Sequence, residues 1–213
     1  MDVRMLTVGP VAENTFLFRR DGAAQAILVD PGDEPERLIA LVDGLGVTVE
    51  AILLTHTHFD HVGAVAPLAR HTGAPVHCPK GEAFILADIM RFTPFPGIGP
   101  YESYDADVLV SGGDRLELAG FAIDVLSTPG HSPDHVTYVV ADEGAIFSGD
   151  VLFQGSIGRT DLPGGDTATL MGSIAMLLDV LPDETRVHPG HMGVTTLGRE
   201  RASNPFLQAL PAT

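Results

Sequence analysis

The feature that most constrains this chain is an apolar run that ends in a cluster of imidazole and carboxylate side chains. Residues 49–54 (VEAILL) form a nearly continuous apolar segment, which is typical of a strand buried on both faces. The segment leads directly into residues 55–61, THTHFDH. Because side chains alternate along a strand, we expect His56 and His58 to project to the same side.

The same motif offers a second group of ligands. Once the chain turns into a following helix, Asp60 and His61 can face a second point beside the first. Imidazole and carboxylate suit Zn, Fe, Mn or Co, and no cysteine lies near the motif, which argues against a structural zinc finger. The residues therefore predict two adjacent ligand clusters, as a pair of divalent cations needs.

Three further turns each present one metal-capable side chain beside a glycine at the end of a predicted strand. These turns are residues 128–131 (TPGH), 148–150 (SGD) and 189–191 (PGH). Their candidate ligands are His131, Asp150 and His191. We interpret the remaining histidines as packing, surface or hydrogen-bonding residues: His71, His77, His135 and His188.

Glycine and proline, 24 and 16 of the 213 residues, divide the chain into short elements. The patterns predict strands at residues 3–8, 15–20, 25–29, 49–54, 75–78, 114–118, 121–126, 136–140, 145–147 and 185–188. They predict helices at residues 34–45, 62–71, 81–91 and 167–181. Each half thus has strands and then a helix, which favours two sheets packed face to face with helices outside over a doubly wound parallel sheet.

One segment fits none of these patterns. Residues 92–107 (FTPFPGIGPYESYDAD) are rich in proline, glycine and aromatic residues and have no hydrophobic period. Long irregular loops inside a domain are usually functional or disordered. We expect a surface excursion here, or a flap over a substrate site.

Composition excludes several function classes. With 12 basic and 28 acidic residues the net charge is −16, and no basic stripe stands out for nucleic acid or an anionic membrane. No apolar run approaches the ~20 residues of a membrane span, and the first ten residues lack a secretory signal pattern. A single cysteine, Cys78, leaves no intramolecular disulfide. We expect one cytoplasmic domain over residues 1–213; the sequence sets no oligomeric state.

The THTHFDH motif with downstream His131, Asp150 and His191 resembles the metal-site pattern of the metallo-β-lactamase superfamily. That resemblance implies a four-layer αββα sandwich with the site at one edge between two mixed sheets. It also implies a ligand assignment: His56, His58 and His131 on the first metal, Asp60, His61 and His191 on the second, and Asp150 on both. A hydroxide bridging the metals would be the nucleophile, and Asp60 would orient it or accept its proton.

Residues 149–166 and 196–206 are similar to the short glyoxalase II-type hydrolases of this superfamily. This narrower resemblance implies hydrolysis of thioesters of small thiols, such as S-lactoylglutathione, with two metal ions. We expect zinc, with iron or manganese as alternatives. Full-length glyoxalase II adds a C-terminal helical domain that holds glutathione, and we expect none here. Candidate substrate contacts are Arg159, Arg199 and Arg201.

Other members of the superfamily supply the competing hypotheses. Persulfide dioxygenases share a similar Gly-Arg-Thr-Asp stretch, here residues 158–161, and use one iron. A lactonase or a β-lactamase-like hydrolase is a further alternative. A nuclease is disfavoured by the lack of a basic face, and a non-enzymatic relative by the complete set of ligand positions.

Overall fold

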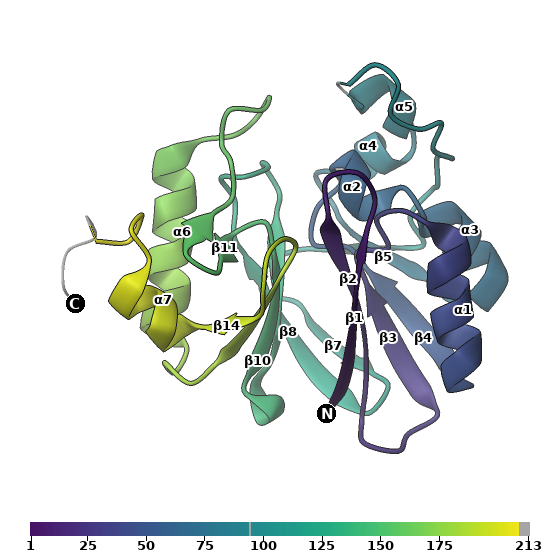
Figure 1. The fold of residues 1–213 in the computed structure, drawn as a ribbon, viewed down its shortest axis with the longest axis horizontal. Coiled ribbons are helices and arrows are strands. Elements are labelled where there is room, and N and C mark those ends of the chain that lie inside the picture. Colours follow the sequence, from purple (N-terminus) through teal and green to yellow (C-terminus); the bar gives the residue numbers. More distant parts are fainter. Residues whose placement is uncertain (94, 209–213) are drawn as a thin grey trace.

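The computed structural model, which describes residues 1–93 and 95–208, is built around two six-stranded mixed sheets (Figure 1). The first sheet has the order β1 (Asp2–Val8), β2 (Glu13–Arg19), β3 (Gln25–Val29), β4 (Thr48–Leu53), β5 (Val76–Pro79) and β6 (Val108–Val110). The second has the order β14 (Thr195–Thr196), β13 (Arg186–Pro189), β10 (Ala145–Gly149), β9 (Val136–Val140), β8 (Phe121–Ser127) and β7 (Arg115–Leu118). A separate hairpin pairs β11 (Leu152–Phe153) with β12 (Ser156–Ile157).

Helices lie on the outer face of each sheet (Figure 1). In the first half they are α1 (Pro35–Leu45), α2 (Phe59–Val62), α3 (Val65–Thr72), α4 (Ala83–Leu86) and α5 (Ile89–Phe92). In the second half they are α6 (Thr167–Val180) and α7 (Leu197–Ser203), and the 3₁₀ turn η1 (Ala141–Glu143) connects β9 to β10. None of the helices in the described ranges is long and apolar enough to cross a bilayer.

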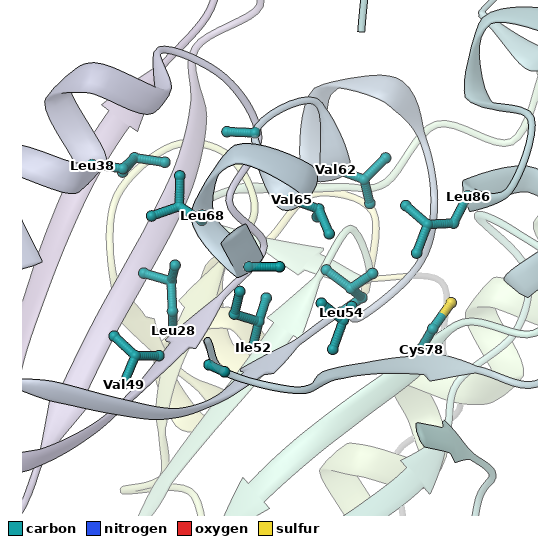
Figure 2. Packing of buried hydrophobic residues seen from close by; sticks show 14 of the residues in the cluster. Leu28, Leu38, Val49, Ile52, Leu54, Val62, Val65, Leu68, Cys78 and Leu86 are labelled. Carbon is teal, nitrogen blue, oxygen red and sulfur yellow. The ribbon is translucent and has the colours of Figure 1, made fainter. Parts of the chain in front are cut away.

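Three hydrophobic clusters fill the spaces between these layers. Along β3, Ala26 and Leu28 face the helices, whereas Ile27 and Val29 face the second sheet, because successive strand side chains point to opposite faces. Figure 2 shows the first cluster, in which Leu28 lies among side chains from α1 and α3. The third cluster joins the second sheet to α6 and α7. Three interfaces between four layers confirm the predicted αββα class.

Strand direction places the ends of four strands at one edge of the sandwich. In the first sheet β4 runs parallel to β3 and β5. In the second, β10 is parallel to β13, and β9 is antiparallel to both β8 and β10. The backbone N–H of Val136 donates to Thr55 O at 2.9 Å, and that of Asn14 donates to Gly190 O at 2.7 Å. These bonds tie the two halves together where the predicted ligand loops begin.

Two predicted helices differ from those observed. The helix expected at residues 62–71 begins three residues later, as α3, and the separate turn α2 precedes it. Between the two helices Gly63 is packed so closely that a Cβ would lie 2.4 Å from Gly32 O. The helix expected at residues 81–91 is two single turns, α4 and α5. The sequence patterns also missed β6, β14, α7 and the β11–β12 hairpin, which are short elements without a full hydrophobic period.

We predict that Leu177→Ala in α6 lowers the free energy of unfolding by about 2–5 kcal/mol, because it removes a fully buried side chain from the third cluster. Val180→Ala in the same helix is the control, since that side chain is 56% exposed. Val180→Ala should change the free energy of unfolding by no more than about 0.5 kcal/mol. Urea titrations of both variants measure the difference, and equal losses would contradict the layer packing.

Candidate metal centre

Three histidines from two loops converge at this edge. His56 and His58 follow β4, and His131 follows β8. The Nδ1 atom of His58 lies 3.1 Å from His56 Nε2 and 2.8 Å from His131 Nε2. Three ring nitrogens therefore face one point, and one cation could contact all three at the roughly 2.0–2.1 Å typical of zinc–nitrogen bonds.

A second group of side chains lies beside the first. Asp60 and His61 stand on the single turn α2, and His191 follows β13. Asp60 Oδ2 is 3.3 Å from His191 Nε2 and 3.8 Å from His61 Nε2. The three ligand atoms of this group also lie within 4.8 Å of one another.

Asp150 lies between the two groups. Its Oδ1 atom is 3.3 Å from His61 Nε2, and its Oδ2 atom is 3.4 Å from His131 Nε2 and 3.5 Å from His191 Nε2. Gly190 permits this approach, because a Cβ there would lie 2.3 Å from Asp150 Oδ1. The structure thus brings all seven predicted ligands together, and their role as ligands stays a prediction.

The residues present fit a pair of divalent cations. Within the described part of the chain, the buried atoms His61 Nε2 and Asp150 Oδ1 have no hydrogen-bond partner. A buried polar atom left in this state destabilises a fold by about 1–3 kcal/mol. A cation between the two atoms would satisfy both. Five imidazoles and two carboxylates are a donor set suited to zinc, iron or manganese.

The second ring nitrogen of several of these histidines is held by an acceptor. His61 Nδ1 lies 3.0 Å from Asp30 Oδ2, and His131 Nδ1 donates to Arg159 O at 2.7 Å. His191 Nδ1 is 3.3 Å from Ala12 O. Such bonds fix the ring orientation and leave the other nitrogen free for a metal.

Sequence reasoning missed two buried carboxylates that support the ligand loops. Asp30 also accepts from Thr55 N at 2.8 Å and from Thr55 Oγ1 at 2.6 Å. Glu82 accepts from Thr57 N at 2.8 Å and from Asp134 N at 3.1 Å, so it joins the loops that carry His56, His58 and His131. Asp30 lies in an Asp-Pro-Gly turn and Glu82 in a predicted helix, and neither position has a local sequence signal of burial.

Burial changes the protonation of the histidines. Burial and the neighbouring histidines hold the pKa of His56 well below its usual value. They lower the pKa of His58 to about 4. Both rings are therefore neutral at pH 7, the form that binds metals. Burial acts to lower the pKa of His61 too, but the charges of Asp150 and Asp60 outweigh it and raise that pKa well above its usual value.

The two groups open into a pocket of about 430 Å³. Arg159 lines it, and its guanidinium makes two hydrogen bonds to Asp161, at 2.7 and 2.8 Å. Arg199 and Arg201 do not line this pocket, and their role as substrate contacts stays a prediction. Both stand on α7 outside the pocket wall, and Arg201 instead pairs with Asp183 at 3.0 Å and donates to Leu178 O.

Three of the four other histidines have contacts that agree with the structural interpretation. His135 lies 3.0 Å from Thr128 Oγ1 and accepts from Asp150 N at 3.1 Å, so both of its ring nitrogens are engaged. His188 is stacked on Phe147 with ring centroids 4.9 Å apart. His71 is on the surface, 2.9 Å from Asp43 Oδ1.

A model of the metallo-beta-lactamase superfamily matches residues 8–191. The chain belongs to this superfamily. Among metallo-beta-lactamase superfamily relatives, the probable metallo-hydrolase YqgX of Bacillus subtilis (strain 168) is 40% identical over 212 residues, covering 97% of this chain and 98% of the relative. Hydroxyacylglutathione hydrolase GloC of Haemophilus influenzae is 36% identical over 211 residues, covering 98% and 99%.

Solved structures of the superfamily agree with the fold over nearly the whole chain. BLEG-1 B3 metallo-beta-lactamase is 39% identical with a TM-score of 0.92, covering 98% of this chain and 100% of that one. TTHA1623 in a di-iron-bound form is 42% identical with a TM-score of 0.79, covering 96% and 100%. ETHE1 from Myxococcus xanthus is 31% identical with a TM-score of 0.77, covering 96% and 84%.

We predict that Asp30→Asn weakens metal affinity about 10- to 100-fold, because the buried carboxylate that orients His61 is lost. Asp33→Asn, three positions along the chain at a carboxylate bonded to Tyr101, is the matched control. Competition with a chromophoric chelator measures both affinities, and thermal melts check that the variants are folded. Equal affinities in the two variants would show that Asp30 does not support the site.

We also predict a contribution of His188 to acid sensitivity. Burial, together with the charge of Arg186, lowers the pKa of His188 to about 4, whereas an unfolded histidine titrates near 6.5. Between these values the unfolded chain binds more protons, so this contribution to stability is present above pH 6.5 and is lost as the pH falls toward 4. His188→Phe, which preserves stacking on Phe147, should lose less unfolding free energy between pH 7 and 4.5 than the parent.

Urea titrations across that pH range measure the slope for His188→Phe. A parental slope in His188→Phe would mean that the native fold does not lower the pKa of His188.

Proposed function

We propose that this metallo-hydrolase superfamily protein is an enzyme that cleaves thioesters of small thiols with two divalent cations. The observation that carries the proposal is the position of Asp150 between two complete ligand groups at the floor of an open pocket. The similarity to GloC over 98% of the chain favours the thioester among the substrates of the superfamily.

We assign the ligands as the convergence of the side chains suggests. The first cation would be held by His56, His58 and His131, the second by Asp60, His61 and His191, and both by Asp150. Zinc is the metal we propose, because imidazole and carboxylate suit it. Iron is the alternative, since a similar structure is in a di-iron-bound form.

When bound, such cations lower the pKa of water toward neutrality and polarise a carbonyl oxygen. Among the described residues, Asp60 is the best placed to orient the attacking water or hydroxide, or to accept its proton. Its side chain lines the pocket, is 15% exposed, and has its Oδ2 atom 3.3 Å from His191 Nε2. Thiolates leave readily because free thiols have a pKa near ~8.5, so no strong acid is needed on the leaving-group side.

A persulfide dioxygenase with a single iron is the second candidate. The match to ETHE1 from Myxococcus xanthus favours it, and the residues of the HxHxDH motif do not separate the two activities. The convergence of Asp60, His61 and His191 on a second point favours two metals and therefore the hydrolase. Metal content and oxygen uptake with glutathione persulfide distinguish them.

A lactonase-like or β-lactamase-like hydrolase is the remaining alternative. Similarity to BLEG-1 B3 metallo-beta-lactamase supports assaying a β-lactam and a lactone beside the thioesters. If the β-lactam or the lactone is hydrolysed with a kcat/KM above that of every thioester, the substrate class is cyclic amides or esters and the proposed thioesterase activity is wrong.

We predict that elemental analysis finds two metal ions per chain. We also predict that a chelator abolishes thioester hydrolysis and that added zinc restores it.

Asp60→Ala should lower kcat at least about 100-fold, the usual contribution of a positioned acid–base group. Asp105→Ala, at an exposed aspartate outside the pocket, is the control and should keep the parental rate. Near-parental activity in Asp60→Ala would remove the role assigned to this carboxylate.

A further inference from the structure

Apart from the metal-site groups, the wall of the pocket is mainly apolar. Aromatic and aliphatic side chains come from both halves of the protein, so the pocket spans the same edge as the ligand groups. Prominent among them are Ile85, Phe92, Phe95, Phe153, Ile157 and Met192. The volume of about 430 Å³ falls in the roughly 300–1,000 Å³ range of sites that enclose most of a small ligand.

Several of these side chains are exposed, although they are large and apolar. Phe92 is 40% exposed, Phe95 41%, and Met192 53%. Phe95 also packs edge-on against Phe59, whose neighbours in sequence are His58 and Asp60, with ring centroids 5.7 Å apart. Contiguous exposed apolar surface beside a polar reaction site marks a binding surface, and an apolar ligand group placed on it would be removed from water.

Apart from any cations held by the ligand groups, the side chains of the pocket wall offer little to an anionic ligand. Among the described residues that line it, Arg159 is the sole lysine or arginine, and Asp161 already occupies its guanidinium with two hydrogen bonds. The protein as a whole carries a net charge of −16. A thiol with several carboxylates, such as glutathione, would find one paired cation on this wall.

We propose that this pocket selects thioesters with an uncharged, apolar acyl group, alkyl or aryl, over small polar acyl groups carried on an anionic thiol. The proposal rests on the thioesterase function proposed above and narrows its substrate class. Phe92 and Phe95 act as specificity-determining residues that cover the acyl chain.

The test uses acetyl, butyryl and hexanoyl thioesters of N-acetylcysteamine, a neutral thiol, with the metal-loaded enzyme. The kcat/KM value should rise about fourfold for each methylene that the pocket buries. S-lactoylglutathione should be hydrolysed with a kcat/KM at least tenfold below that of the hexanoyl substrate. A flat series, or a preference for S-lactoylglutathione, would overturn the proposal.

Two variants test the assigned residues. Phe95→Ala and Phe92→Ala should each lower kcat/KM for the hexanoyl thioester about tenfold and change the acetyl value less than twofold. Phe206→Ala removes another half-exposed phenylalanine, outside the pocket, and should change neither value. Equal losses on both substrates in both pocket variants would indicate a structural role and contradict the selection.

A binding measurement separates this proposal from the proposed reaction. Calorimetry with the non-hydrolysable S-methyl, S-butyl and S-hexyl thioethers of N-acetylcysteamine should give a Kd that falls with chain length, and Phe95→Ala should reduce that fall. If the thioethers bind in this order but no thioester is cleaved, the reaction is wrong and the apolar site stands. If thioesters are cleaved at rates independent of chain length, the reaction stands and the apolar selection is wrong.

Discussion

The packing of the two sheets against each other is the constraint on which the site depends. Phe16 and Phe18 of β2 meet Phe147 of β10 in the cluster between the sheets, with ring centroids 5.6 and 4.4 Å away from the Phe147 ring. At the site edge, the buried hydroxyl of Tyr138 donates to Leu54 O at 2.8 Å. Neither half carries the seven ligands alone, so a shift between the sheets would separate the two halves of both ligand groups.

The sequence predicts well those parts of the site whose structure is caused by a local pattern along the chain. The apolar run at residues 49–54 is buried because both faces of its strand are covered. His56 and His58 do converge as predicted, but they lie in the loop after β4, so strand alternation is not the cause of their convergence. The sequence has a glycine beside Asp150 and beside His191, and the close contact of Gly190 with Asp150 gives the reason at that position. These features need no knowledge of distant contacts.

The other features of the fold and the site could not be predicted from the sequence, because they arise from contacts between distant segments. Asp30 and Thr55 are 25 positions apart, as are Glu82 and Thr57, so no periodic pattern links the members of either pair. Short elements such as α7 and β14 are fixed by tertiary packing and not by a hydrophobic period. The arginines of α7 suggested anion recognition by position alone, and the observed pairing of Arg201 with Asp183 has no local signal.

The charged metal-site residues and the apolar wall of the pocket act together on its chemistry. The apolar wall excludes water, and charges such as those of Asp60 and Asp150 interact more strongly where water is excluded. Asp60 and Asp150, which line the pocket, therefore exert larger effects on charges near them than they would at an open surface. An apolar acyl group packed on Phe92 and Phe95 would add to this exclusion. On this view substrate selection and proton control depend on the same surface.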